Sequence, residues 1–334
     1  MTPERAKLAS DFLGNAGWGD AGRRTLAGDA SSRRYERLTK PSGETAILMD
    51  APLGSNNSIT PFVTIARHLN GIGLGAPHSY SDDPSTGFLL QEDLGDALFA
   101  RVIPKAPHLE STLYTAATDV LICLHGAPPP DLTVFGPDLM AEQASLVFDT
   151  WVQTISGPCA SGTTDEFRSR LAELLHNTTQ GAPVMILRDY HAENLLWLPE
   201  RSGVARVGLI DFQDAMLAHP GYDLVSLLQD VRRDVPANVE AAMIAHFIHH
   251  SGAQDAQFRT AYAVLGLQRN LRILAVFARL VTGMGKPQYA KLIPRTWGHV
   301  MRGLSHPALS SIAPLLIETL PEPTPANLRK LAPA

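Results

Sequence analysis

Two carboxylates and an amide lie next to short apolar segments in the middle of the chain. Asp189 follows the segment VMILR, Asn194 precedes the run LLWL, and Asp211 ends the run VGLI. Packing alone explains these positions poorly, because an unpaired carboxylate is costly to bury. One carboxylate can orient the proton of an attacking hydroxyl, while the second carboxylate and the amide oxygen suit Mg2+. The three residues therefore predict phosphoryl transfer from a magnesium nucleotide.

Each of these side chains has a second interpretation when it is taken alone. Asp189 could cap a turn and Asp211 could cap a helix, which are common uses of aspartate. Asp214 could reach the hydroxyls of a substrate or cap the next turn. Asp223 begins an apolar helical pattern, where it could cap the helix or brace the loop around Asp189. The joint spacing of Asp189, Asn194 and Asp211 between apolar segments favours a shared site.

The segments that would position these residues differ between the two ends of the chain. Near the N-terminus, RRTLAG, RRYERL and ETAILMD predict three successive antiparallel strands. A helix is expected over 61–71, followed by strands at PHSYS and GFLLQE. Long helical patterns follow residue 108 and are interrupted by a group of short strands over 183–211. We therefore expect an α+β fold in which a small antiparallel β lobe precedes a larger, mainly helical lobe.

Composition excludes several classes of protein. The 28 Lys and Arg against 33 Asp and Glu give a formal net charge of -5, so no basic field would hold a nucleic acid. The 2 cysteines exclude a cysteine-rich zinc site and a disulfide framework. No apolar run is long enough to cross a membrane, and the charged N-terminus lacks the pattern of a secretory signal. We expect a cytoplasmic protein with a small-molecule substrate and no obligatory protein partner.

The motif D-x-H-x-x-N at 189–194, followed by I-D-F at 210–212, resembles the catalytic core of the aminoglycoside phosphotransferase and choline kinase superfamily. That superfamily shares the bilobal, protein-kinase-like fold. The resemblance implies that Asp189 is the catalytic base and that Asn194 and Asp211 bind Mg2+. Leu187 and Arg188 stand where the usual family pattern has His and Gly.

The segment TLAGDASSRRYERL resembles the nucleotide loop of the same superfamily. The small residues of such a loop let backbone N–H groups approach phosphates. An ordinary hairpin connection would also suit Gly-Asp-Ala-Ser-Ser. The resemblance implies phosphate-binding roles for Gly28, Ser31, Ser32 and Arg33.

The segment GFLLQEDLGD resembles the hinge that joins the two lobes and holds adenine through main-chain groups. It implies that the carbonyl of Glu92 and the amide of Leu94 bind adenine. The alternative is a buried edge strand that ends in an acidic turn. With this hinge, the resemblance implies a nucleotide-binding lobe over 1–93 and a catalytic, substrate-binding lobe over 94–334.

The third predicted strand departs from the family. Met49 stands near the position where most kinases place a phosphate-binding Lys, and no Lys occurs between Lys40 and Lys105. Another cation must replace it, or nucleotide binding is weak. Arg33 and Arg34 are the nearest candidates, although both could be a solvated charge pair at the start of a strand.

From about residue 23 to 234, the motifs resemble most closely the bacterial kinases that phosphorylate the anomeric hydroxyl of N-acetylmuramate and N-acetylglucosamine in peptidoglycan recycling. This resemblance implies transfer of the γ-phosphate of ATP, with Mg2+, to a sugar hydroxyl. Two alternatives are an aminoglycoside phosphotransferase and a catalytically silent nucleotide-binding sensor. Aminoglycosides are polycations and need an acidic cleft, whereas segments such as RSRLAE and QDVRRDV mix both signs of charge.

Overall fold

The computed structural model describes residues 2–26, 33–52, 54 and 58–331. The chain forms two compact units, each built from two separate stretches. The first unit contains residues 1–127 and 192–215, and the second contains 128–191 and 216–334. The expected division into nucleotide-binding and catalytic lobes near residue 93 stays a prediction.

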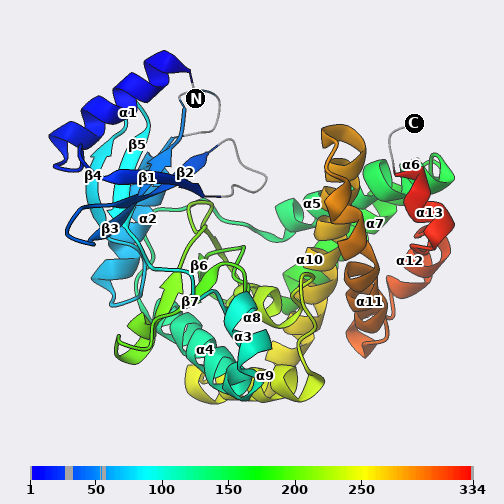
Figure 1. The fold of residues 1–334 in the computed structure, drawn as a ribbon. Helices are drawn as coiled ribbons and strands as arrows, with labels where there is room; N and C mark the ends of the chain where they lie inside the picture. The colour runs from blue at the N-terminus through cyan, green and yellow to red at the C-terminus, as the bar shows by residue number, and fades with distance from the viewer. Residues whose placement is uncertain (1, 27–32, 53, 55–57, 332–334) are drawn as a thin grey trace. The chain divides into compact units, whose positions relative to one another are not determined.

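A five-stranded antiparallel sheet forms the N-terminal part of the first unit (Figure 1). The five strands fall on the five predicted segments. Their spatial order is β1-β2-β3-β5-β4, so β5 is an inner strand. The bounds are β1 Gly22–Leu26, β2 Arg34–Thr39, β3 Thr45–Asp50, β4 Ser79–Asp83 and β5 Phe88–Glu92.

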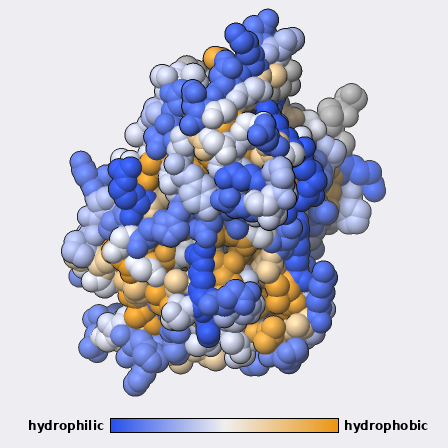
Figure 2. Space-filling model, turned by 60° about the vertical axis from the view of Figure 1, so that its left-hand side comes forward, coloured by the Kyte–Doolittle hydropathy of each residue, from blue (hydrophilic) through white to orange (hydrophobic). Residues whose placement is uncertain are grey.

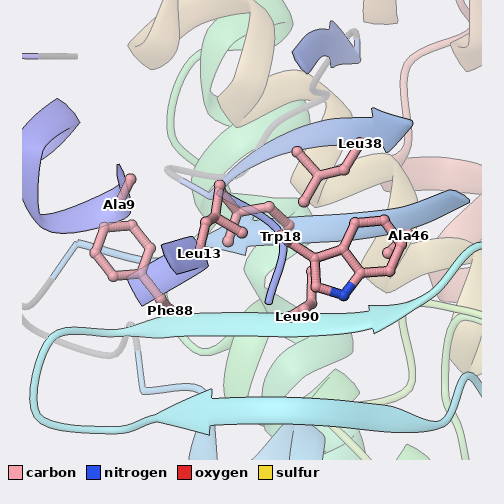
Figure 3. Packing of buried hydrophobic residues seen from close by; sticks show 8 residues of the cluster. Ala9, Leu13, Trp18, Leu38, Ala46, Phe88 and Leu90 are labelled. Atoms are coloured by element: carbon pink, nitrogen blue, oxygen red, sulfur yellow. The ribbon is translucent and has the colours of Figure 1, made fainter. Parts of the chain in front are cut away.

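Helix α1 (Pro3–Asn15) packs an apolar cluster against one face of this sheet. Side chains of a strand alternate between its two faces, so Ala46 and Leu48 of β3 point to the same side. Both lie in the cluster, together with Leu13 of α1 and Trp18 (Figure 3). Met49, the residue after Leu48, is fully buried on the opposite face.

The first unit continues with helices and a short hairpin. The helices are α2 Thr60–Gly71, α3 Phe99–Lys105, η1 Pro107–Leu109 and α4 Glu110–Gly126. The hairpin pairs β7 (Leu195–Trp197) with β8 (Val207–Leu209), and the short helix η3 (Gly203–Arg206) lies between the two strands.

Gly75 fits closely against this hairpin. Its carbonyl accepts a hydrogen bond of 3.0 Å from the amide of Leu209. A Cβ atom at position 75 would lie 2.4 Å from the carbonyl oxygen of Val207 and 2.7 Å from that of Ala205. Both neighbours are backbone atoms that cannot rotate away, so this contact requires glycine.

We expect Gly75→Ala to lower the free energy of unfolding by about 1–3 kcal/mol, the usual cost of overpacking. Gly71→Ala is the matched control, because a Cβ atom there meets nothing within 4 Å. Urea denaturation of both variants measures the difference. Equal stability of the two variants would contradict the close approach at Gly75.

The second unit is mainly helical. Among the described residues it has one pair of strands, in which β6 (Val184–Ile186) runs antiparallel to β9 (Met216–Ala218). Helix α10 (Asp255–Met284) is the longest, and most of its middle residues are buried. The other helices are α5 Pro137–Val147, η2 Phe148–Val152, α6 Gln153–Ser156, α7 Thr163–Thr178, α8 Gly221–Leu228, α9 Ala237–Ser251, η4 Pro287–Leu292, α11 Ile293–Leu304, η5 Pro307–Leu309, α12 Ala313–Thr319 and α13 Pro325–Lys330.

The expected α+β fold, with an antiparallel N-terminal sheet and a mainly helical remainder, is confirmed. Hydrophobic residues occur among many hydrophilic ones on the face drawn in Figure 2. Of the helices in the described ranges, none combines the length and apolarity that a membrane span requires.

Candidate active site

The β7–β8 hairpin of the first unit brings Asn194 and Asp211 together. Leu195 and Leu209 are paired across the two strands, and the amide of Ile210 donates to the carbonyl of Asn194 at 3.1 Å. Asn194 precedes β7 and Asp211 follows β8, so both lie at the same end of the hairpin. The Nδ2 atom of Asn194 is 3.5 Å from Oδ2 of Asp211.

Asp211 is held in an uncommon backbone conformation. Its φ of 61° lies in the left-handed region, which Asp tolerates better than most residues. The next residue, Phe212, is fully buried, and its ring centroid lies 4.6 Å from that of Phe62 in α2. Nε2 of Gln213 donates to Asp211 at 3.0 Å and to Asp214 at 3.1 Å. The buried ring and the amide of Gln213 thus fix the position of the Asp211 carboxylate.

Asn194 and Asp211 have the chemistry of a magnesium site completed by waters and substrate. Within the described ranges, no group of three or more His, Cys, Asp and Glu side chains could hold a metal ion. Mg2+ usually binds one or two carboxylates and takes its other ligands from water and substrate phosphates. One carboxylate and one amide at the end of a hairpin fit that pattern.

The loop that carries Asp189 is braced from helix α8 in the second unit. The buried carboxylate of Asp223 accepts hydrogen bonds from the backbone amides of Leu187 and Arg188, the latter at 2.9 Å. The hydroxyl of Ser226 donates to the carbonyl of Arg188 at 3.1 Å. Of the two alternatives considered for Asp223, these hydrogen bonds show the brace of the loop. Leu187 is itself buried, so the brace acts on backbone amides rather than on a side chain at that position.

The profile of the phosphotransferase enzyme family matches residues 22–258 of this chain. The chain belongs to that family. A relative from Caulobacter vibrioides, named N-acetylmuramate/N-acetylglucosamine kinase, is 38% identical over 351 residues, covering 93% of this chain and 96% of the relative. A relative with the same name from Pseudomonas putida is 29% identical and covers 92% of both chains. Family membership and these kinase-named relatives confirm that the chain is a small-molecule kinase.

Solved structures confirm the protein-kinase-like fold of this phosphotransferase. A choline/ethanolamine kinase family protein from Mesorhizobium loti superimposes with a TM-score of 0.64 at 15% identity, covering 93% of this chain and 99% of the other. An aminoglycoside phosphotransferase in complex with ADP and hygromycin B gives a TM-score of 0.61 at 15% identity, covering 91% and 100%. At 15% identity, the similarity to these two structures shows the fold alone.

Arginine charges keep Asp189 of the phosphotransferase ionised. Burial by itself would raise the pKa of Asp189, but the positive charges of Arg272, Arg269 and Arg188 lower that pKa below its usual value. NH1 of Arg232 lies 3.1 Å from Nε2 of His191. Because a guanidinium can only donate, Nε2 must accept, and the imidazole is neutral. Burial and the charge of Arg232 lower the pKa of His191 to about 3.

The structure describes only some of the residues that were predicted to bind the nucleotide. Gly28, Ser31 and Ser32 lie outside the described residues. Arg33, the residue before β2, hydrogen-bonds the side chain of Tyr35. Burial raises the pKa of Tyr35; the charge of Arg33 lowers this pKa, and the charge of Asp211 raises it. Arg33 and Asp211 therefore lie near the same phenol.

The position of the missing lysine is apolar. Met49 is fully buried and pairs with Tyr35 on β2 and with Leu89 on β5. Since strand side chains alternate, Arg34 of β2 points to the face opposite Tyr35 and Met49, whereas Arg33, just before the strand, contacts Tyr35. Of the two arginines considered as replacements for the lysine, Arg33 is thus the one that lies beside Tyr35, the strand partner of Met49.

The predicted hinge follows an inner strand of the sheet. The amide of Glu92 donates to the carbonyl of His78 at 2.8 Å, and its carboxylate accepts from Arg201. The half-buried Leu94 follows. Because β5 lies between β3 and β4, the alternative of an edge strand is wrong. The adenine-binding roles of the Glu92 carbonyl and the Leu94 amide stay predictions.

Arg232, Arg269 and Arg272 were not predicted from the sequence. Arg269 is 2% exposed, and its NH2 donates to Ser226 at 2.7 Å. A signal for the pair on α10 is present in the segment LGLQRNLRILA, where two arginines three residues apart interrupt an apolar helix. Charges in such a position need partners, and these partners lie far away in the sequence.

The buried histidines predict how stability depends on pH. Burial lowers the pKa of His219 and of His299 to about 4, and the pKa of His191 is about 3. The unfolded chain binds these protons near pH 6.5, well before the folded chain does, so the free energy of unfolding falls as the pH drops below 6.5. Burial raises the pKa of Asp223 to about 7, which acts in the opposite direction over the same range.

We expect the free energy of unfolding to fall by roughly 2–4 kcal/mol between pH 7 and pH 5, since three histidines outweigh one aspartate. Urea denaturation at the two pH values measures this difference. His219→Gln keeps an acceptor for the amide of Gly221, which lies 3.0 Å from Nδ1 of His219, and should reduce the pH dependence. Stability that rises on acidification would contradict the assignment of neutral buried histidines.

Proposed function

We propose that this phosphotransferase transfers the γ-phosphate of ATP, with Mg2+, to the anomeric hydroxyl of N-acetylmuramate and N-acetylglucosamine. The observation that carries the proposal is the 38% identity to the Caulobacter vibrioides kinase of that name, which extends over 93% of this chain. This alignment includes the helical segments after residue 216 as well as the motifs around Asp189. A reaction that consumes ATP also favours a cytoplasmic location.

Asp189 is the proposed catalytic base. Its lowered pKa keeps it ionised at neutral pH, so it can accept a hydrogen bond from the sugar hydroxyl and orient the oxygen for attack. The brace from Asp223 to the amides of Leu187 and Arg188 holds the loop in one conformation. Catalysis of this kind depends mainly on position, so a fixed loop matters as much as the carboxylate itself.

Asn194 and Asp211 are the proposed magnesium ligands. When bound, Mg2+ would neutralise negative charge that develops on the phosphate oxygens. The contact of Gln213 with Asp211 orients the carboxylate, in the way that outer partners of metal ligands commonly do.

Arg33 is the proposed substitute for the missing lysine. Its contact with Tyr35, the strand partner of Met49, supports this role. Gly28, Ser31 and Ser32 would complete the phosphate contacts, and the Glu92 carbonyl and Leu94 amide would bind adenine. With these roles, residues 1–93 would form the nucleotide-binding lobe and 94–334 the catalytic lobe.

Acceptor profiling tests this function. ADP release is measured with N-acetylmuramate, N-acetylglucosamine, kanamycin, and a 1,5-anhydro analogue of N-acetylglucosamine that lacks the anomeric hydroxyl. We expect turnover with the first two acceptors and none with the anhydro analogue. Turnover of the analogue would move the reaction to another hydroxyl, turnover with kanamycin alone would indicate antibiotic modification, and nucleotide binding without turnover would favour a sensor.

A further inference from the structure

Gln91 is a buried polar residue of the inner strand β5 in the first unit. Its side chain is 6% exposed, and its Oε1 atom has no hydrogen-bond partner among the described residues. The side chains beside it are Ile47, its strand partner on β3, and Leu89, two residues earlier on β5. Both are aliphatic and cannot pair with a carboxamide. Because buried polar groups are normally hydrogen-bonded, this oxygen indicates a donor that a ligand supplies.

Gln91 lies on the face of the sheet opposite to helix α1. Strand residues alternate between the two faces, so Gln91 points away from Leu90, which packs in the apolar cluster with α1 (Figure 3). Its partner Ile47 points to the same side as Gln91, and so does Met49, two residues after Ile47. Tyr35, the strand partner of Met49, lies on this face as well.

This face extends from the proposed phosphate contacts to the proposed hinge. At one end, Arg33 hydrogen-bonds the side chain of Tyr35, and the charge of Asp211 acts on the same side chain. At the other end, Gln91 directly precedes Glu92, whose carbonyl is the proposed partner of adenine. A nucleotide that reaches both ends would therefore place its base beside the carboxamide of Gln91.

A glutamine carboxamide matches one edge of adenine. It can accept a hydrogen bond from the exocyclic N6 amine and donate one to the ring nitrogen N7. The proposed hinge contacts use the other edge, where the Glu92 carbonyl would accept the second N6 hydrogen and the Leu94 amide would donate to N1. Both sets of contacts can therefore form together. Guanine carries an oxygen at position 6, which cannot donate to Oε1 of Gln91.

We propose that Gln91 binds the N6 amine and N7 of adenine and thereby favours ATP over GTP. This inference rests on the proposed function, which places the base beside Glu92 and Leu94. It adds a contact to N7, which the hinge does not make. Bound adenine would supply the donor that Oε1 lacks, whereas guanine would leave this buried acceptor without a partner.

Calorimetry of nucleotide binding tests this role without any sugar. The protein is titrated, with Mg2+, with ADP, GDP and 7-deaza-ADP, in which a C–H group replaces N7 while N1 and the N6 amine remain. We expect 7-deaza-ADP to bind about 3- to 10-fold more weakly than ADP, the usual effect of losing one hydrogen bond. GDP should also bind more weakly than ADP.

Gln91→Leu removes the carboxamide and keeps a side chain of similar size. This variant should bind ADP about 10-fold more weakly, should no longer distinguish ADP from 7-deaza-ADP, and should narrow the difference between ADP and GDP. Gln257→Leu, at an exposed position of helix α10, is the matched control and should keep all three affinities.

Equal affinities of the unaltered protein for ADP and 7-deaza-ADP would overturn the inference. A Gln91→Leu variant that keeps the full difference between these two nucleotides would also overturn it. The first comparison needs no variant, so it decides the question even if Gln91→Leu does not fold. If ADP itself does not bind, the proposed use of ATP is wrong and this inference falls with it.

Discussion

Asp189→Asn is expected to lower kcat by about two to four orders of magnitude, the usual contribution of a general base. The amide keeps the size of the side chain but cannot take up a proton. Because the pKa of Asp189 is held below its usual value, this residue should stay ionised across pH 5 to 9, and its titration should not limit the rate there. Steady-state kinetics with the preferred sugar, over that pH range, measure both effects.

Glu193→Gln is the matched control for this prediction. It changes an acid to an amide four residues further along the chain, at an exposed position, and should retain nearly full activity. Affinity for ADP and thermal stability should be alike in both variants. A kcat for Asp189→Asn within a few-fold of the unaltered enzyme would show that Asp189 is not the base.

Asp211→Asn is expected to lower kcat by about two to four orders of magnitude, because a bound metal contributes several kcal/mol of charge stabilisation in the transition state. The variant should also need a higher Mg2+ concentration for half-maximal rate, since the amide carries no negative charge. Kinetics across a Mg2+ titration measure both quantities.

Asp214→Asn separates this metal role from a general loss of negative charge. Asp214 lies three residues further on and accepts from the same Gln213 side chain. Whether it caps a turn or contacts a substrate hydroxyl, its change should leave the Mg2+ requirement unaltered. Equal shifts in the Mg2+ requirement for both variants would contradict the assignment of Asp211 as a ligand.

The fold could be predicted from sequence because its elements are local patterns. The aliphatic run of β3 and the turn residues before it place that strand correctly, and the paired strands β7 and β8 fall on two short apolar runs. Sequence could not show that β5 lies inside the sheet, because strand order depends on pairings between distant segments. For the same reason, the sequence could not show that each compact unit combines two stretches that are separate along the chain.

The candidate site was predictable where its residues lie within one motif. Asn194 and Asp211 lie at the same end of one hairpin, next to its first and last strand residues, so the apolar runs beside them indicated their proximity. Arg272 was not predictable, because helix α10 begins 66 residues after Asp189 and carries no motif of its own. Its charge acts on Asp189 through the packing of helices, and helix packing is not readable from a single sequence.

Phosphorus NMR of the reaction products tests the central claim most directly, that Asp189 supports phosphoryl transfer to an anomeric hydroxyl. The enzyme is incubated with ATP, Mg2+ and N-acetylmuramate or N-acetylglucosamine, and Asp189→Asn is run in parallel. We expect a new phosphorus signal coupled to the anomeric proton of the sugar, together with ADP, and no such signal with the variant. A signal coupled to another sugar proton, or an equal signal with Asp189→Asn, would contradict the account.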